Sequence, residues 1–164
     1  MAVSAKAPSD REIERKFLAR DDGWKAQVSG DPIPMRAGYL STRPEATVRV
    51  RMEGADAVLT IKGKALDADG RERPEFNLPM PAAQAEAILA GPMVEGGVVR
   101  KTRWPVDVDG HAFTVDVFEH PRPGLVLVEI ELPDRNADFP RPGWLGQEVT
   151  GDMSYMNSSI AKEA

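Results

Sequence analysis

Residues 11–18 read R-E-I-E-R-K-F-L and alternate in a pattern that a β-strand explains. Successive side chains of a strand point to opposite faces, so Glu12, Glu14 and Lys16 share one face, opposite Ile13. Same-face neighbours lie about 7 Å apart, close enough for the two carboxylates to repel each other. Exposure of one face to solvent is enough to explain a single strand of this kind. Whether it explains residues 11–18 depends on the pattern of the other strands.

The composition indicates one soluble domain. The chain has 164 residues, of which 41% are hydrophobic and 29% charged. We expect a flexible tail over residues 1–10 and a single domain over 11–164. The net charge of −5 and the absence of a long apolar run argue against nucleic acid and membrane partners. With no cysteine, two histidines and no apolar leader, the sequence predicts a cytoplasmic protein without thiolate or multi-histidine chemistry.

Alternation with a period of two recurs along most of the chain. The predicted strands are 11–19, 33–42, 46–53, 57–64, 71–79, 98–106, 112–119 and 125–132. Turn sequences such as M-E-G-A-D and D-V-D-G separate several of them, which favours antiparallel neighbours. Helical signals are limited to 81–90 and a short segment at the end of the chain. The Pro-rich stretch 133–146 is expected to be a surface connection.

Sorting each strand by parity gathers ionisable side chains on one face and Val, Ile, Leu, Phe or Trp on the other. The positive side chains of the charged faces are Lys16, Arg49, Arg51, Lys62, Lys64, Arg73, Lys101 and Arg103. The negative ones are Glu12, Glu14, Glu75, Asp116, Glu129 and Glu131. Polar-out alternation is ordinary for one half-solvated strand, but here the pairs also sort by sign from strand to strand.

One architecture accounts for this pattern. The sequence predicts a mainly β (α+β) fold in which eight antiparallel strands close into a barrel, a tunnel with a charged lumen, flanked by a few helices. Cations confined in such a lumen repel one another unless a polyanion lies among them, and carboxylates beside a polyanion require a bridging divalent metal. Oxygen ligands alone suit Mg²⁺ or Mn²⁺. The lumen is therefore expected to bind a metal–polyphosphate complex.

The same residues resemble a known family. E-I-E-R-K at 12–16 is similar to the ExExK signature of the CYTH domain, or triphosphate tunnel metalloenzyme, superfamily. Further landmarks follow in the family's order: R-V-R at 49–51, T-I-K-G-K at 60–64, R-P-E at 73–75, K-T-R at 101–103, D-V-F at 116–118, V-E-I-E at 128–131 and E-V-T-G-D-x-x-Y-x-N at 148–157. ExExK alone is a weak pattern, whereas the ordered series over residues 11–160 is specific.

The resemblance implies a role for each residue type. The phosphate-binding residues would be Lys16, Arg49, Arg51, Lys62, Lys64, Arg73 and Arg103. The metal ligands would be Glu12, Glu14, Glu129 and Glu131, with Asp116 and Glu75 as helpers. In the short bacterial triphosphatases of the family, a tyrosine–lysine pair has been proposed as the catalytic dyad, and the matching positions are Tyr39 and Lys101.

Two positions depart from the family's pattern. Asn77 takes the second acidic position of the usual RxExE strand, which removes a metal ligand or a base that orients water. Ser158 follows Y-x-N where relatives often have lysine, which removes one cationic contact to the substrate.

The favoured function is metal-dependent hydrolysis of inorganic triphosphate to pyrophosphate and phosphate by a monomer or homodimer. Two rivals remain: nucleotide chemistry in the same tunnel (a class IV-type adenylate cyclase or a thiamine or nucleoside triphosphatase) and a non-catalytic polyphosphate-binding module. Lys101 acts either as a base that activates water or as a positive charge, and the sequence leaves both open.

Overall fold

The structure is a computed structural model that describes residues 11–69 and 71–164. At Arg11 and Glu12 it describes the backbone and not the side chains. The predicted tail 1–10 and the predicted metal ligand Glu12, as a side chain, therefore lie outside the described residues.

In the described part of the chain nine strands form. They are β1 (Arg11–Ala19), β2 (Ile33–Arg43), β3 (Ala46–Glu53), β4 (Asp56–Gly63), β5 (Glu72–Met80), β6 (Glu95–Val108), β7 (His111–His120), β8 (Val126–Glu131) and β9 (Leu145–Glu148). The first eight match the eight predicted strands, with ends that differ by at most three residues.

Helices are short and few in the same part of the chain. They are the 3-10 helices η1 (Asp22–Gln27) and η2 (Met153–Tyr155) and the α-helices α1 (Ala82–Ala90) and α2 (Asn157–Ala161). Pro81 precedes α1 and Gly91 ends it, as the sequence predicts. None of the helices described has the length and apolar character needed to cross a lipid bilayer.

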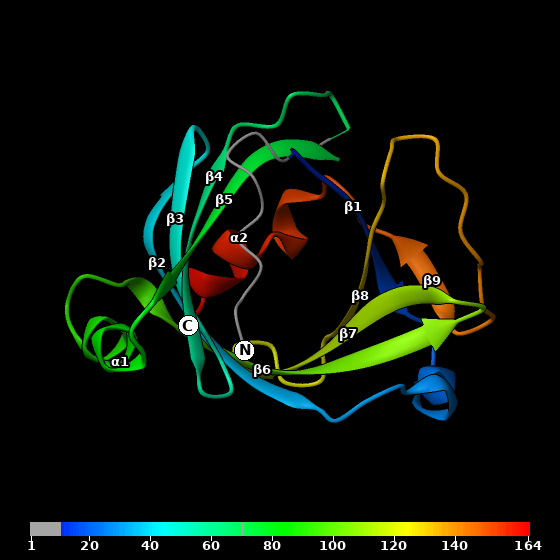
Figure 1. The fold of residues 1–164 in the computed structure, drawn as a ribbon, viewed down its shortest axis with the longest axis horizontal. Helices are drawn as coiled ribbons and strands as arrows, with labels where there is room; N and C mark the ends of the chain where they lie inside the picture. The colour runs from blue at the N-terminus through cyan, green and yellow to red at the C-terminus, as the bar shows by residue number, and fades with distance from the viewer. Residues whose placement is uncertain (1–10, 70) are drawn as a thin grey trace.

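The strands close into an antiparallel barrel (Figure 1). Their order is β5-β4-β3-β2-β6-β7-β8-β1, and residues 11–13 of β1 pair with residues 72–74 of β5 to complete the ring. The β6–β7 connection is a two-residue turn in which Asp109 and Gly110 both have positive φ, 52° and 81°. Such a turn matches the twist of adjacent strands, and Asp-Gly is a preferred sequence for it. The predicted eight-stranded barrel is confirmed.

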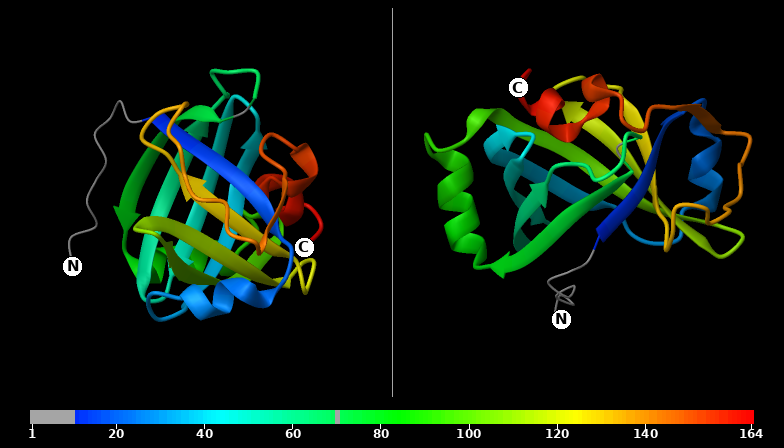
Figure 2. Two further views of the ribbon diagram at one scale, coloured as in Figure 1. Left: turned by 90° about the vertical axis from the view of Figure 1, so that its right-hand side faces the viewer. Right: turned by 90° about the horizontal axis from the view of Figure 1, so that it is seen from above.

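Most of the hydrophobic core lies outside the barrel wall. Val50 and Met52 of β3 pack with Ala85 and Leu89 of α1 on one side. On the other, η1 and the segment before β9 cover β1, β7 and β8, and the largest members of this cluster are Phe17, Trp24, Phe113, Phe139 and Trp144. Figure 2 shows α1 and η1 on opposite sides of the barrel. The apolar strand faces therefore point outward, which leaves the inward faces to the charged residues.

One end of the lumen is apolar. Tyr39, Val99 and Phe118 form a buried cluster there with Ile160 and Ala161 of α2. The C-terminal helix thus packs against the strands at this end.

The sequence predicts a surface connection over residues 133–146. This prediction is wrong for the last two of them, which belong to strand β9. L-G-Q-E has a single apolar residue and no period-two signal, so its extended form depends on a partner. That partner is the second half of β1, where Phe17 pairs with Glu148 and Ala19 with Leu145. The two halves of β1 therefore have different neighbours, β5 and then β9.

Gly146 is the residue that allows β9 to approach β1. A Cβ atom there would lie 2.7 Å from the backbone oxygen of Leu18. We expect Gly146→Ala to lower the free energy of unfolding by roughly 1–3 kcal/mol, the usual cost of overpacking, as measured by urea denaturation. Gly143→Ala is the matched control because a Cβ at Gly143 meets nothing within 4 Å. Equal stability of the two variants would contradict the described pairing.

Candidate active site

A cavity of about 720 Å³ occupies the polar part of the barrel. The predicted site residues that line it are Glu14, Lys16, Tyr39, Arg49, Arg51, Lys62, Lys64, Arg73, Glu75, Arg103, Glu129 and Glu131. They come from seven of the strands and from the residue that follows β4. The parity of the strands therefore brings together side chains that are up to 117 positions apart in sequence, from Glu14 to Glu131.

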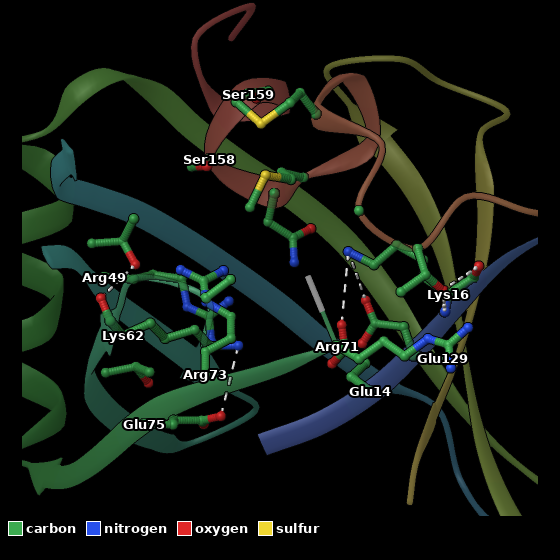
Figure 3. A pocket seen from close by; sticks show the side chains of 18 of the residues that line it. Glu14, Lys16, Arg49, Lys62, Arg71, Arg73, Glu75, Glu129, Ser158 and Ser159 are labelled. Atoms are coloured by element: carbon green, nitrogen blue, oxygen red, sulfur yellow. Dashed lines mark hydrogen bonds and ion pairs between the residues drawn. The ribbon is translucent and has the colours of Figure 1, made fainter. Parts of the chain in front are cut away.

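Positive side chains gather on the β3–β5 side of the cavity. Figure 3 shows Arg49, Lys62 and Arg73 close together there. Arg49 is only 8% exposed. Arg73 donates to the backbone oxygen of Gly63 at 3.1 and 3.3 Å, and Lys62 lies 3.7 Å from Glu75. This wall is therefore cationic, with Glu75 as its carboxylate.

Arg51 carries the clearest electrostatic signature of this wall. Burial lowers its pKa to about 10, and the positive charges of Arg49 and Arg103 act in the same direction. Glu53, at 2.6 Å, only partly offsets them. A guanidinium that loses proton affinity on folding is destabilised in its charged form, and a bound anion would relieve that cost.

Carboxylates gather on the opposite side, on β1 and β8. In the register of these strands Glu14 faces Glu131 and Lys16 faces Glu129. Lys16 Nζ lies 3.9 Å from Glu14 and 3.5 Å from Glu129 (Figure 3). Burial alone would raise the pKa of Glu129, but the charge of Lys16, with help from Arg103 and Lys101, outweighs it and the pKa is lowered. Glu129 is thus ionised, as a metal ligand must be.

Lys101 and Asp116 lie beneath the cavity. Lys101 is 6% exposed and Asp116 only 1%. Asp116 accepts from Lys101 Nζ at 2.5 Å and from Arg103 at 2.7 and 2.8 Å, so both of its oxygens are engaged. The role of Asp116 as a metal ligand stays a prediction. These contacts favour another role, in which Asp116 anchors Lys101 and Arg103.

The buried ion pairs change the pKa values of these groups in different directions. Burial lowers the pKa of Lys101, and the nearby carboxylates Asp116 and Glu129 only partly compensate. For Arg103 the hydrogen bonds to Asp116 outweigh burial and raise the pKa. The pKa of Asp116 is held low by Lys101 and Arg103 against the effect of its burial.

Tyr39, the other member of the predicted dyad, lies on β2 directly opposite Arg49 of β3. Its side chain is 5% exposed and borders the cavity. The structure thus brings Tyr39 and Lys101 to the same end of the lumen, near the apolar cluster beneath α2.

The departure at Asn77 has a structural consequence. Asn77 accepts from the Thr60 hydroxyl at 2.8 Å and donates to Glu75 Oε1 at 2.7 Å. A carboxylate at this position could not donate to Glu75 in its ionised form. The neutral amide therefore fixes the orientation of Glu75.

Several residues that line the cavity were not among the predicted site residues. Arg71 borders the cavity, as its shared parity with Arg73 indicates. Asn157, Ser158 and Lys162 border it from α2 and its C-cap. Lys162 follows Ser158 by four residues, which places both on one face of the helix and supplies a cation one turn beyond the serine.

The carboxylates of β1 and β8 offer oxygen ligands to a divalent metal. No three carboxylate or imidazole groups gather into a metal site among the described side chains, which do not include Glu12. Mg²⁺ is usually held by one or two carboxylates while phosphate oxygens and waters complete its shell. Glu14 and Glu131, opposite each other, with Glu129 beside them, fit a hard cation that binds together with a phosphate chain.

Comparisons with known proteins agree with this geometry. The chain is 38% identical over 152 residues to the inorganic triphosphatase of Acetivibrio thermocellus, covering 93% of this chain and 94% of that one. It is 36% identical over 156 residues to the inorganic triphosphatase of Nitrosomonas europaea, covering 92% and 96%. The crystal structure of the inorganic triphosphatase NE1496 superposes with a TM-score of 0.65 at 33% identity, over 93% of this chain and 95% of that one.

The family comparison covers almost the whole barrel. The model of the CYTH domain matches residues 10–161. The charged barrel is therefore a CYTH domain, and the chain belongs to that family.

Proposed function

We propose that this protein hydrolyses inorganic triphosphate to pyrophosphate and phosphate inside the barrel, with a divalent metal. The observation that carries the proposal is the buried arginine cluster, in which the pKa of Arg51 is lowered to about 10 by burial and by its neighbours. Such a cluster is suited to a compact polyanion. The relatives at 36–38% identity that are named inorganic triphosphatases support the same activity.

The cationic wall of β3–β5 would bind the phosphate chain. Arg49, Arg51, Lys62 and Arg73 reach the cavity from three adjacent strands, with Lys64 at its edge. Their charges would stabilise the negative charge on the transferred phosphoryl group, which is the main demand of this reaction. Asp116 would keep Arg103 in place for the same purpose, through its two hydrogen bonds.

Glu14, Glu129 and Glu131, with Glu12 on the same strand face of β1, would hold Mg²⁺ or Mn²⁺. The ion would neutralise phosphate oxygens and so allow carboxylates to lie beside a polyanion. Lys16 lies between Glu14 and Glu129 and would limit their repulsion.

Water attack requires a group that takes a proton. Lys101 is favoured as this base, because burial lowers its pKa and so raises the fraction of neutral amine at a given pH. Tyr39 would orient the water or the amine. The new bond joins the water oxygen to a terminal phosphorus, the bridging P–O bond breaks, one water proton passes to Lys101, and pyrophosphate leaves.

The lining favours inorganic triphosphate over a nucleotide or thiamine compound. Within the described residues Tyr39 is the only aromatic side chain that borders the cavity. Stacking on aromatic side chains is a common means of holding a flat heterocycle, and a single tyrosine that is almost fully buried offers little surface for it.

The central test is a panel of inorganic triphosphate, ATP and thiamine triphosphate with Mg²⁺ or Mn²⁺. We expect phosphate release from inorganic triphosphate to be fastest, no cyclic AMP from ATP, and no turnover in excess EDTA. Tight binding of triphosphate without phosphate release would indicate a binding module instead. Full turnover in excess chelator would contradict the metal assignment.

Arg51→Ala tests the cationic wall. Triphosphate binding should weaken by roughly 1.5–3 kcal/mol, the range for a charge-assisted hydrogen bond, as measured by calorimetry. Because Arg51 is destabilised in its charged form, the melting temperature without ligand should stay level or rise. A variant that unfolds would show that Arg51 is structural.

Lys101→Arg separates a base from a fixed charge. With Lys101 as the base, the rate should rise with pH up to its lowered pKa and level off above it. Arginine stays protonated over this range, so Lys101→Arg should lose the alkaline rise and most of the turnover. An arginine variant that keeps substantial activity and the same pH profile would make the role of Lys101 electrostatic.

A further inference from the structure

A second, much smaller pocket adjoins the main cavity. Its volume is about 10 Å³, close to the space that a single water molecule needs. It is lined by Met35, Ala37, Tyr39, Arg49, Arg51, Val99, Lys101 and Asn157. Four of these residues, Tyr39, Arg49, Arg51 and Asn157, also border the main cavity. A water in the small pocket would therefore lie beside the phosphate-binding wall.

The polar groups that line this pocket differ in whether they can accept a hydrogen bond. Arginine and charged lysine donate and cannot accept. A water held by them alone would have no acceptor for its hydrogens, and its lone pairs would be directed at the donors. The side chains of Tyr39 and Asn157 are the lining groups that can accept from it.

Both acceptors are available for this purpose. Tyr39 is 5% exposed and borders the main cavity, and its hydroxyl is not among the buried polar atoms without a partner in the described residues. The hydroxyl therefore reaches the open space of the cavity, where it can accept from a water. Asn157 is the first residue of α2, and no side chain caps this helix, so its amide is not used for capping.

We propose that the small pocket holds the water molecule that attacks triphosphate and that Asn157, not only Tyr39 and Lys101, orients it. The inference rests on the proposed function. The amide oxygen of Asn157 and the Tyr39 oxygen accept the two hydrogens of the water, so that an oxygen lone pair is directed toward phosphorus. On attack the Tyr39 oxygen takes one proton from the water and passes its own hydroxyl proton to the neutral amine of Lys101, while the bridging P–O bond breaks and pyrophosphate leaves.

The first test replaces the amide. Asn157→Ala removes the acceptor, and kcat should fall roughly a hundredfold, the scale of a misplaced reactant, while KM for triphosphate stays unchanged. Asn157→Asp keeps an acceptor oxygen, so kcat should recover toward wild type, with a higher KM because the added charge repels phosphate. Asn136→Ala, in an exposed loop, is the control and should match wild type in both.

The second test fills the pocket without changing a polar group. Ala37 lines the small pocket and not the main cavity. Ala37→Val should lower kcat strongly and leave triphosphate binding intact, as measured by calorimetry. Ala57→Val is the control for overpacking and should keep the wild-type kcat. Ala57 is also buried, 5% exposed against 8% for Ala37, but it packs in the outer cluster beneath α1.

The outcomes separate this inference from the proposed function. If wild-type protein releases no phosphate from triphosphate, the proposed function is wrong, and the inference that rests on it is wrong as well. If wild type turns over and both Asn157→Ala and Ala37→Val keep its kcat, the water site is overturned while the function stands. A fall in melting temperature with no change in kcat would give Asn157 a structural role only, which also overturns the inference.

Discussion

Arg49 and Arg51 lie on the same face of β3, and their guanidinium groups repel each other inside the barrel. Carboxylates of β3 itself and of other strands offset this repulsion. Glu53 of β3 lies beside Arg51, Glu75 of β5 beside Lys62, and Asp116 of β7 between Lys101 and Arg103. Each carboxylate neutralises part of the positive charge, and the remaining positive charge faces the cavity. A lumen built in this way is stable enough to fold and still favours an incoming anion.

The same constraint explains why most of the hydrophobic core is on the outside. A barrel of eight strands can be filled by its own side chains or can hold a small ligand. Here the inward positions are largely committed to charge, so apolar burial has to come from layers placed over the outer faces. α1 covers β3 on one side, and η1 with the aromatic residues around Trp144 covers β7 and β8 on the other. The inward faces of the strands thus carry the charged site, and the outward faces of the same strands carry most of the apolar packing that stabilises the fold.

The strands and the residues that face the cavity could be predicted because a period of two fixes both at once. Parity placed Glu14, Arg51 and Glu129 in one lumen, although they are far apart in the chain. Contacts that depend on side-chain reach could not be predicted in this way. Asp116 has the parity of a lumen residue, but Lys101 and Arg103 enclose it below the cavity. The place of β9 depends on its tertiary neighbour β1, since L-G-Q-E has no local pattern that identifies a strand. Asn157 belongs to the landmark at 148–157, but that pattern does not show which pocket its side chain borders.

The division of β1 between two neighbours bears on how the chain reaches its native state. β1 leaves the ribosome before the other eight described strands, but its partners β8 and β9 end at residues 131 and 148. Loop closure over more than a hundred residues is entropically costly and slows folding. During synthesis only residues 11–13 of β1 can pair early, with β5, and the rest of β1 stays unpaired until most of the domain has emerged. Unpaired edges are sites of aggregation. The alternating charges of R-E-I-E-R-K are a protection that such an edge needs, so the residues that serve the lumen in the folded protein also keep the nascent strand from pairing with other chains.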